Sequence, residues 1–388
     1  MNILADHVDR AELMRLLVRE SLEHWLAAAA TESGFFRVNL DRQWRPVSPQ
    51  TSSLVSQSRL IYVMACGHEV TGRSEYQGAA RRGADFLLSA FPDPQHGMLF
   101  FQVDEQGGVV DDQKSAYGHA FAIFGLAHAF GCMGDKRYLD AATDLWRQMR
   151  RRMACAKGGF HATFSRDFAQ VTAPNSQNPL MHLFEALLAL HDAGGDEEIF
   201  RDANTLAEFI YGRLYDDRLG RLPEFFDDDW QPVRDWPEGY IDLGHQFEWA
   251  FLLSRAVEKG FAPRYLDIAT RLLEYGMKHA YDAVEGGIFS RGRYDGITDR
   301  AAKGWWQQAE HLRTLAHFAG LRGRGDLLAA YDQSWHFARR HFLDDQYGGW
   351  YASYTPGRDR NEAEMAKGNI WKAGYHETGM FMETLRLL

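Results

Sequence analysis

The sequence predicts an all-α fold, an (α/α)6 barrel or toroid with short β-hairpins in the long loops at one end. Three observations predict it. A glycine-aromatic motif occurs six times, amphipathic helical segments flank each copy, and the links between successive helix pairs are short. One helix pair cannot bury its apolar faces alone, so six pairs must stack, and six pairs can close into a ring. We expect a single domain over residues 1–388. An open superhelix or two helical domains are the alternatives.

The repeated motif begins at a glycine, continues with apolar residues that alternate with polar ones, and ends in a charged turn. It reads SGFFRVNLDRQW in the first copy and GGWYASYTPGRD in the last. Each copy has the alternation and the turn residues of a short β-hairpin. The motif recurs about every 62 residues, at Gly34, Gly97, Gly159, Gly220, Gly287 and Gly349.

Helical segments with apolar residues at i, i+3, i+4 and i+7 fill the space between the motifs. The helices before the six copies are expected over Glu12–Ala30, Tyr76–Ala90, Tyr138–Cys155, Ile199–Leu214, Tyr265–Ala280 and Asp326–Phe342. The helices after them are expected over Leu54–Val70, Tyr117–Gly131, Met181–His191, His245–Lys259, Trp305–Leu321 and Trp371–Leu387. All the long loops then lie at one end of the barrel, where we expect the function.

Composition and charge exclude several classes of protein. A chain of 388 residues with 13% aromatic residues can bury a core, which excludes disorder. A net charge of −10 argues against nucleic acid or an anionic membrane as partner. Cys66, Cys132 and Cys155 form no ligand pattern, which indicates a reduced, cytoplasmic protein. The first residues lack the features of a signal peptide, and no apolar run is long enough to span a membrane.

Polar and aromatic residues gather near the start of each second helix. If the second helices form the inner ring, these clusters converge on the loop-bearing mouth, where helix N-termini favour an anionic intermediate or an oxygen-rich ligand. The clusters read QSR (57–59), YGHAF (117–121), NPLMHLFE (178–185), LGHQFEW (243–249), GWWQQAEH (304–311) and WKAGYHE (371–377).

Two clusters hold a histidine and a glutamate three residues apart, His182 with Glu185 and His245 with Glu248. Such residues share a helix face, so the carboxylate can orient the ring and raise its pKa, as general acid–base catalysis requires. Capping or core polar pairs are the alternative. A metal site is a rival, but the order reverses the Glu-x-x-His of di-iron carboxylate proteins and HExxH is absent. We expect no metal and no other cofactor.

Aromatic residues accompany the clusters, and the apolar faces of sugars stack on such rings. Trp305 and Trp306 are adjacent on a helix, so at most one is expected to line a pocket. A glycoside hydrolase is another candidate, because such enzymes on α/α barrels use two carboxylates. The acidic runs 111–112 and 227–229 are nevertheless typical of solvated turns. The sequence shows no P-loop, GxGxxG or GxSxG motif.

Four segments, LGHQFEWAFLL, NPLMHLFEALL, KGWWQQAE and WKAGYHETG, resemble the N-acylglucosamine 2-epimerase superfamily, and the resemblance covers nearly the whole chain. Within it, the GHQFEW segment with Gln246 and Trp249 looks closest to mannose isomerases, other aldose–ketose isomerases and mannose 2-epimerases. The family fold is an (α/α)6 barrel. The resemblance implies that His245 and His376 are the catalytic histidines. Family members carry an arginine about ten residues before the first of these, whereas Arg234 precedes it by eleven.

The resemblance also implies a set of substrate-binding residues. Arg59 and Tyr117 hold the O1–O2 end of the sugar. Asn178 and His182, an Asn-x-x-x-His pair, contact the sugar and its enediolate. Glu248 and Glu310 are supporting carboxylates, and Trp306 is a stacking tryptophan.

The implied reaction is proton transfer through a cis-enediolate by histidine, without metal or nucleotide. We expect a sugar isomerase that interconverts an aldose and a ketose of the mannose and fructose kind. A 2-epimerase acting on mannose, an N-acylglucosamine or cellobiose is the alternative. Outside this class stand an α/α-barrel glycoside hydrolase and a non-catalytic carbohydrate-binding repeat protein. The expected partners are a monosaccharide substrate and a second copy of the chain in a homodimer.

Overall fold

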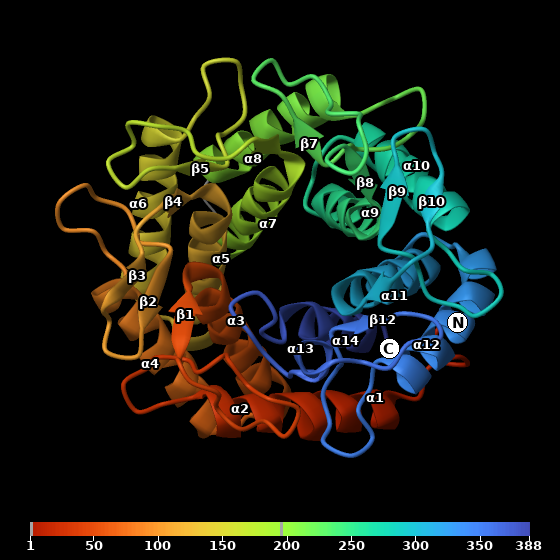
Figure 1. The fold of residues 1–388 in the computed structure, drawn as a ribbon, viewed down its shortest axis with the longest axis horizontal. Helices are drawn as coiled ribbons and strands as arrows, with labels where there is room; N and C mark the ends of the chain where they lie inside the picture. Colours follow the sequence, from red (N-terminus) through yellow and green to blue (C-terminus); the bar gives the residue numbers. More distant parts are fainter. Residues whose placement is uncertain (1–2, 195–196) are drawn as a thin grey trace.

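Two concentric rings of helices form the molecule over residues 3–194 and 197–388, which the structure, a computed structural model, describes (Figure 1). The inner ring consists of α3 (Leu54–Thr71), α5 (Ala116–Met133), α7 (Gln177–Gly194), α9 (Leu243–Glu258), α11 (Trp305–Leu321) and α14 (Tyr375–Leu387). The outer ring consists of α1 (Arg10–Leu17), α2 (Glu23–Ala29), α4 (Ser74–Ala90), α6 (Lys136–Arg152), α8 (Glu197–Phe209), α10 (Arg264–His279) and α12 (Leu328–His341). Because α14 contacts both α11 and α3, the inner ring is closed. The predicted (α/α)6 barrel is confirmed.

The helices of the two rings differ in how much of their surface is buried. The outer helix α6 buries one stripe, with Tyr138, Ala142, Leu145 and Met149 three to four residues apart and charged residues on the other side. The inner helix α3 is buried on all sides over most of its length. An inner helix therefore packs against the outer ring and also faces the centre of the barrel. Among the described residues, none of the helices combines the length and the apolar character needed to cross a membrane.

Most predicted helices have the expected positions, but their ends differ. The first outer helix is interrupted by a π-helical turn at Val18–Leu22. The last inner helix was predicted from Trp371 and begins at Tyr375 instead, because Gly374 adopts a left-handed conformation with φ of 73°. Trp371 therefore lies in a loop. The short α13 (Glu362–Met365) belongs to the same long connection.

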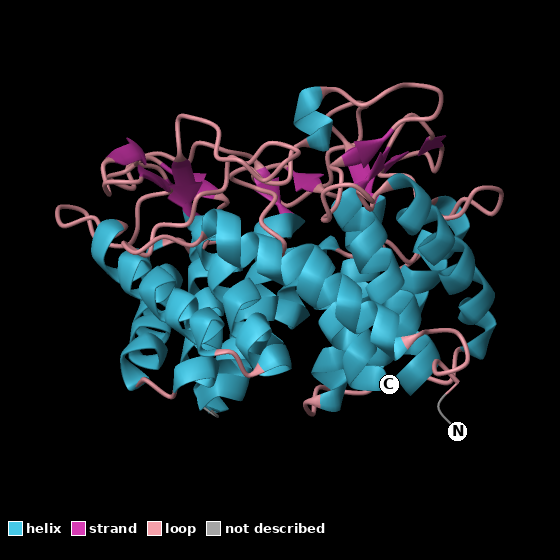
Figure 2. Ribbon diagram, turned by 90° about the horizontal axis from the view of Figure 1, so that it is seen from below, coloured by secondary structure: helices cyan, strands magenta, loops and turns pink. Residues whose placement is uncertain are grey.

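Short strands lie at one end of the barrel, above the helices (Figure 2). Each strand that leads into an inner helix pairs with a strand of the next motif along the chain, so neighbouring repeats are joined by hydrogen bonds. A bridge between Leu40 and Gly368 links the first motif to the last loop. The pairs are β1 (Thr51–Ser53) with β2 (Gln102–Asp104), β4 (Lys114–Ser115) with β5 (Thr163–Phe164), β6 (Asn175–Ser176) with β7 (Phe225–Phe226), β8 (Tyr240–Asp242) with β9 (Arg291–Arg293), and β11 (Lys303–Gly304) with β12 (Ser353–Tyr354). Local hairpins add β3 (Val109–Asp111) to β2 and β10 (Thr298–Asp299) to β9.

Backbone conformation and close packing explain why the motif begins with glycine. Gly34 has φ of 88°, and a Cβ there would overlap the carbonyl oxygen of Arg82 on α4. An amide side chain on the inner helix then binds the motif backbone. In the first repeat, Gln57 accepts from the amide of Phe36 and donates to the carbonyl of Gly34. Gln246 and Gln308 bind their own motifs in the same way, so these glutamines hold the loops rather than a ligand.

Candidate active site

A cavity of about 810 Å³ opens at the loop-bearing end of the barrel, and all six inner helices contribute to its wall. Of the nine residues predicted for the site, Glu310 is fully buried behind His376. The other eight line the cavity: Arg59, Tyr117, Asn178, His182, His245, Glu248, Trp306 and His376.

His245 lies at the start of α9, where the side chain of Asp242 caps the helix by accepting from the amides of Gly244 and His245. The expected pairing with Glu248 is wrong. Nδ1 of His245 instead lies 2.7 Å from Oε2 of Glu224, which comes from the loop just before β7. The pairing therefore joins two segments 21 residues apart rather than one turn of a helix.

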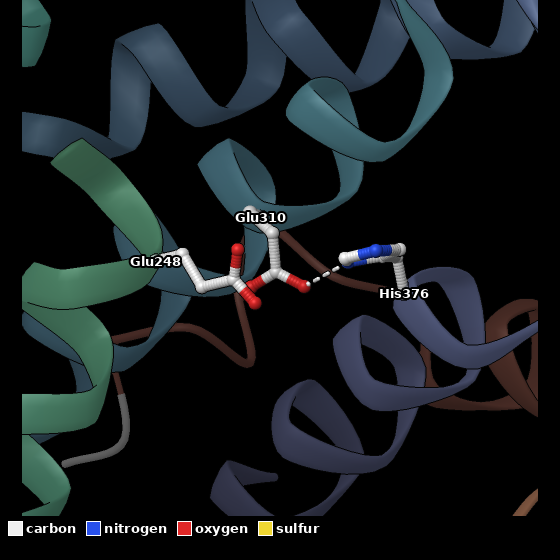
Figure 3. Close-up of side chains that lie close together, drawn as sticks. All are labelled: Glu248, Glu310 and His376. Atoms are coloured by element: carbon white, nitrogen blue, oxygen red, sulfur yellow. Dashed lines mark hydrogen bonds and ion pairs between the residues drawn. The ribbon is translucent and has the colours of Figure 1, made fainter. Parts of the chain in front are cut away.

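His376 has a different environment. Its Nδ1 lies 2.8 Å from Oε1 of Glu310 on α11, and Glu248 on α9 extends toward the same carboxyl group (Figure 3). Neither carboxylate oxygen of Glu248 has a hydrogen-bond partner among the described residues. Arg313, one turn along α11, lies with Nη1 3.4 Å from the other oxygen of Glu310, Oε2. The two glutamates thus form a buried acidic pair beside the ring.

These environments give the two histidines opposite charge states. Burial by itself would lower the pKa of His245, but the carboxylates of Glu224 and Asp242 outweigh it and raise the pKa to about 10. Burial, reinforced by the positive charge of Arg59, lowers the pKa of His376 well below its usual value. At neutral pH, His245 is an imidazolium ion and His376 is neutral.

The two carboxyl groups of the acidic pair also differ in pKa. Burial and the nearby Glu310 raise the pKa of Glu248 well above its usual range. Burial raises the pKa of Glu310 only to about 7, because Arg313 favours its ionised form. Glu248 therefore holds its proton to higher pH, and Glu310, which ionises above a pH of about 7, then accepts from Nδ1 of His376. The Nε2 lone pair of His376 is then left for a substrate.

The wall between α3 and α7 holds the remaining polar contacts. Arg59 donates from Nη2 to the hydroxyl of Tyr117 (2.8 Å) and from Nη1 to the carbonyl of Trp371 (2.5 Å). His182 lies 3.2 Å from Glu185 through Nδ1, so this second His-x-x-Glu pair forms as predicted. The hydroxyl of Tyr375 donates to the same carboxylate. Arginine, tyrosine and histidine thus face the cavity from one side.

The indole ring of Trp306 packs against both catalytic candidates. The ring centroid of Trp306 lies 4.8 Å from that of His245 and 5.4 Å from that of His376. Trp305 also lines the cavity, so the expectation that only one of this pair would do so is wrong. Trp249 instead is fully buried between helices.

A metal ion is chemically compatible with one cluster. Glu248, Glu310 and His376 each offer a ligand atom, and these atoms lie within 4.8 Å of one another. The acidic runs considered for hydrolysis do not line the cavity. Asp227 instead accepts from the amides of Asp229 and Gln231 in a turn.

A family model described as N-acylglucosamine 2-epimerase (GlcNAc 2-epimerase) matches residues 34–378. The chain belongs to this family. It is 24% identical to the cellobiose 2-epimerase of Bacteroides fragilis over 98% of this chain and 99% of that protein. It is 27% identical to the D-mannose isomerase of Marinomonas mediterranea over 92% of each. The solved cellobiose 2-epimerase of Spirochaeta thermophila is 25% identical, with a TM-score of 0.88 over 97% of this chain and 96% of that one. The protein is thus a carbohydrate isomerase or epimerase.

The arginine expected before the histidine of the N-acylglucosamine 2-epimerase family is not in the cavity. Arg234 is exposed and packs its guanidinium on the ring of Tyr294. Arg291 of β9 lines the cavity instead and lies over the ring of Tyr240. Other lining residues that sequence reasoning missed are Glu224, Asp242, Ser290, Asp299, Lys303 and Ser353. All of them come from the strands or the loops beside them, where sequence alone shows no partner across repeats.

Proposed function

We propose that this enzyme interconverts an aldose and its ketose at C1 and C2 of a mannose-like monosaccharide, and that residues 1–388 act as one domain. The observation that supports this most is the opposite charge of two histidines facing one cavity, neutral His376 and cationic His245. One can accept a proton and the other can donate one without prior rearrangement. The relatives with the names D-mannose isomerase and cellobiose 2-epimerase are consistent with chemistry at these carbons.

The first step forms an enediol from the open-chain aldose. Nε2 of His376 takes the proton from C2, the electrons of that bond form the C1–C2 double bond, and His245 gives its proton to O1. Arg59 and Tyr117 hold the O1–O2 end by charge-assisted and hydroxyl hydrogen bonds. His376 is then cationic and His245 neutral.

The second step forms the ketose. The hydroxyl at C2 loses its proton to His245, a C2=O bond forms, and the electrons of the double bond take the proton from His376 at C1. Both histidines return to the charge states with which they began. The fixed ion pair between His245 and Glu224 suits a cycle of this kind, because each turnover regenerates the cation.

A 2-epimerase is the second candidate, because both histidines pack against the same indole of Trp306. If His376 takes the C2 proton and His245 returns one on the opposite face, the sugar is epimerised. The two histidines then end with exchanged charges, and protons must pass through solvent before the next turnover. The asymmetric environments make this the less favoured outcome.

Incubation with mannose in heavy water, followed by NMR of the products, tests the proposal. Fructose is expected, with deuterium at C1 to the extent that His376 exchanges its proton with solvent. Glucose with deuterium at C2 would instead show an epimerase. Cellobiose in the same assay tests for a disaccharide substrate. New reducing ends from a mannose oligosaccharide would favour the hydrolase, and no change in any sugar would favour a binding protein.

Removal of metal ions with a chelator tests the metal alternative. We expect full turnover after dialysis against a chelator, because the proposed proton transfers use only protein groups. Loss of turnover that Mn²⁺ or Mg²⁺ restores would instead assign the Glu248–Glu310–His376 cluster to a cation. The predicted homodimer stays a prediction.

A further inference from the structure

We propose that Glu224, held by Gln177 and Trp249, is a positioning residue that fixes the orientation and the protonation of His245. This inference rests on the proposed function, in which His245 supplies a proton. The three side chains form one buried chain of hydrogen bonds that runs from the barrel wall to the histidine. Their exposed fractions are 3%, 0% and 0%, in the order given.

The chain has a direction that elementary chemistry sets. The indole nitrogen of Trp249 can only donate, and it donates to Oε1 of Gln177 (2.6 Å). This orients the amide, so Nε2 of Gln177 is the atom that donates to Oε2 of Glu224 (2.7 Å). Burial alone would raise the pKa of Glu224, but His245 and the hydrogen bonds from Gln177 and Ser176 lower it, so Glu224 receives this hydrogen bond as a carboxylate. Ser176 donates to the other oxygen at 3.2 Å.

The orientation of Glu224 decides the state of His245. With Oε2 accepting from Gln177, the ring nitrogen 2.7 Å away must present its hydrogen to the same oxygen. Nδ1 of His245 is therefore protonated, and Nε2 is the nitrogen left for the sugar. Nε2 of Gln177 is also 2.8 Å from Nδ1, and because both nitrogens are donors they converge on the carboxylate rather than on one another.

The position of Glu224 in the repeat supports a dedicated role. In five repeats the amide at the start of an inner helix donates to a carbonyl of the next motif, and Glu224 provides that carbonyl to Gln177. The equivalent residues in the other four are Phe101, Ala162, Ser290 and Ala352. None of these four is charged, so the backbone role does not require a carboxylate. The glutamate side chain serves the histidine.

Other charged groups around His245 do not replace this contact. Asp242 caps the same helix by accepting from the backbone amide of His245, and its charge helps to raise the pKa of the ring. Glu248 lies one turn along α9 and holds a proton, while His182 faces the ring from α7 and its pKa is lowered by burial. Glu224 is the carboxylate in hydrogen-bond contact with the ring among the described residues. Its removal should therefore affect the charge of His245 directly.

Glu224→Gln tests the proposal. Imidazole NMR of the substrate-free enzyme should show the titration of His245 moving down by roughly 1–3 pH units. The alkaline limit of kcat should move by the same amount, with KM changed less than threefold. Glu224→Asp, which keeps the charge, should restore part of the shift. Trp249→Phe, which keeps an aromatic ring but removes the indole donor, should give a smaller shift in the same direction.

Glu383→Gln is the matched control. Glu383 is also buried and lies 2.7 Å from a histidine, His317, outside the cavity. It should leave the titration of His245 and the pH profile unchanged. An unchanged titration in folded Glu224→Gln, or in Trp249→Phe if the first variant does not fold, overturns the proposal. The NMR measurement needs no turnover, so it separates this outcome from a failure of the proposed function.

Discussion

Buried charges occur in two regions of this enzyme, at the roots of the motif loops and in the wall of the cavity, and they are satisfied differently. At one loop root, Lys114 pairs with Asp93 at 2.9 Å and both side chains are fully buried. The second oxygen of Asp93 accepts from two backbone amides and from Arg166. The pair Lys367–Asp344 repeats this arrangement. These charges have complete sets of partners.

The cavity wall contains similar side chains with incomplete sets of partners. Glu248 has no hydrogen-bond partner on either oxygen, and Nε of Arg59 and Oδ1 of Asn178 also lack one among the described residues. Buried polar groups are nearly always satisfied, and exceptions gather where a ligand binds or chemistry occurs. The contrast teaches that complete buried pairs stabilise the loop roots, whereas the incomplete groups of the cavity wall lie where a ligand can satisfy them. The predictions below test that division.

The largest expected effect is on turnover, in His376→Ala and His245→Ala. Each should lower kcat by roughly 10²–10⁴-fold, because a general acid or base is lost. Circular dichroism should show a folded protein in both. His119→Gln is the control, since His119 accepts from a motif amide in the place where other repeats have glutamine. It should keep turnover, and near-normal turnover in either alanine variant would contradict the proposed roles.

The next effect is on stability rather than on chemistry. Asp93→Ala leaves Lys114 buried without its partner, which should lower the free energy of unfolding by about 3–5 kcal/mol. Urea unfolding measures this, and kcat below the new transition should stay close to that of the parent. Asp217→Asn removes an exposed pair with Arg271 and should cost about 1 kcal/mol or less. Equal costs in the two variants would contradict a stabilising role for the complete buried pair at this loop root.

The pH dependence is the third effect. The imidazolium form of His245 is the required acid, so kcat should be retained below its pKa of about 10 and fall above it. The fall should approach tenfold per pH unit. Because the pKa of His376 is lowered, its own protonation sets no limit near neutrality. Protonation of Glu310, whose pKa is about 7, removes the acceptor for Nδ1 of His376, so kcat should also fall below that pH. Rates from pH 5 to 11, with the fold monitored at each pH, measure the profile. An alkaline limit near pH 7 would contradict the assignment.

The barrel was predictable because its signals are local and repeated. A glycine with positive φ, such as Gly34, and an apolar stripe such as that of α6 are properties of short segments. Family resemblance then located the nine site residues, and eight line one cavity. The start of the last inner helix was misplaced because the left-handed turn at Gly374 outweighs the apolar pattern before it.

Partners between repeats were not predictable. Glu248 was expected beside His245 from helical spacing, but a strand pairing between different repeats brings Glu224 there instead. The one signal available was the comparison of motif copies, in which Glu224 is a charged residue where equivalent positions are apolar or small. The use of Gln246 and Trp249 as indicators of substrate specificity also relied on sequence alone, without knowledge of which groups these side chains contact. Both are fully buried in the barrel wall and contact other protein groups.

The smallest expected effect concerns Trp371, which the misplaced helix start had put inside α14. Its side chain is 46% exposed, yet it lines the cavity and its ring contacts those of Phe101 and Tyr117. Arg59 binds only its backbone carbonyl, so Trp371→Ala should leave that contact in place. The loss of one stacking surface should raise KM about 2- to 10-fold with little change in kcat. Val284→Ala, which changes an 87% exposed side chain outside the cavity, is the control for steady-state kinetics. A fall in kcat of more than tenfold in Trp371→Ala would instead assign this residue a role in the chemical step.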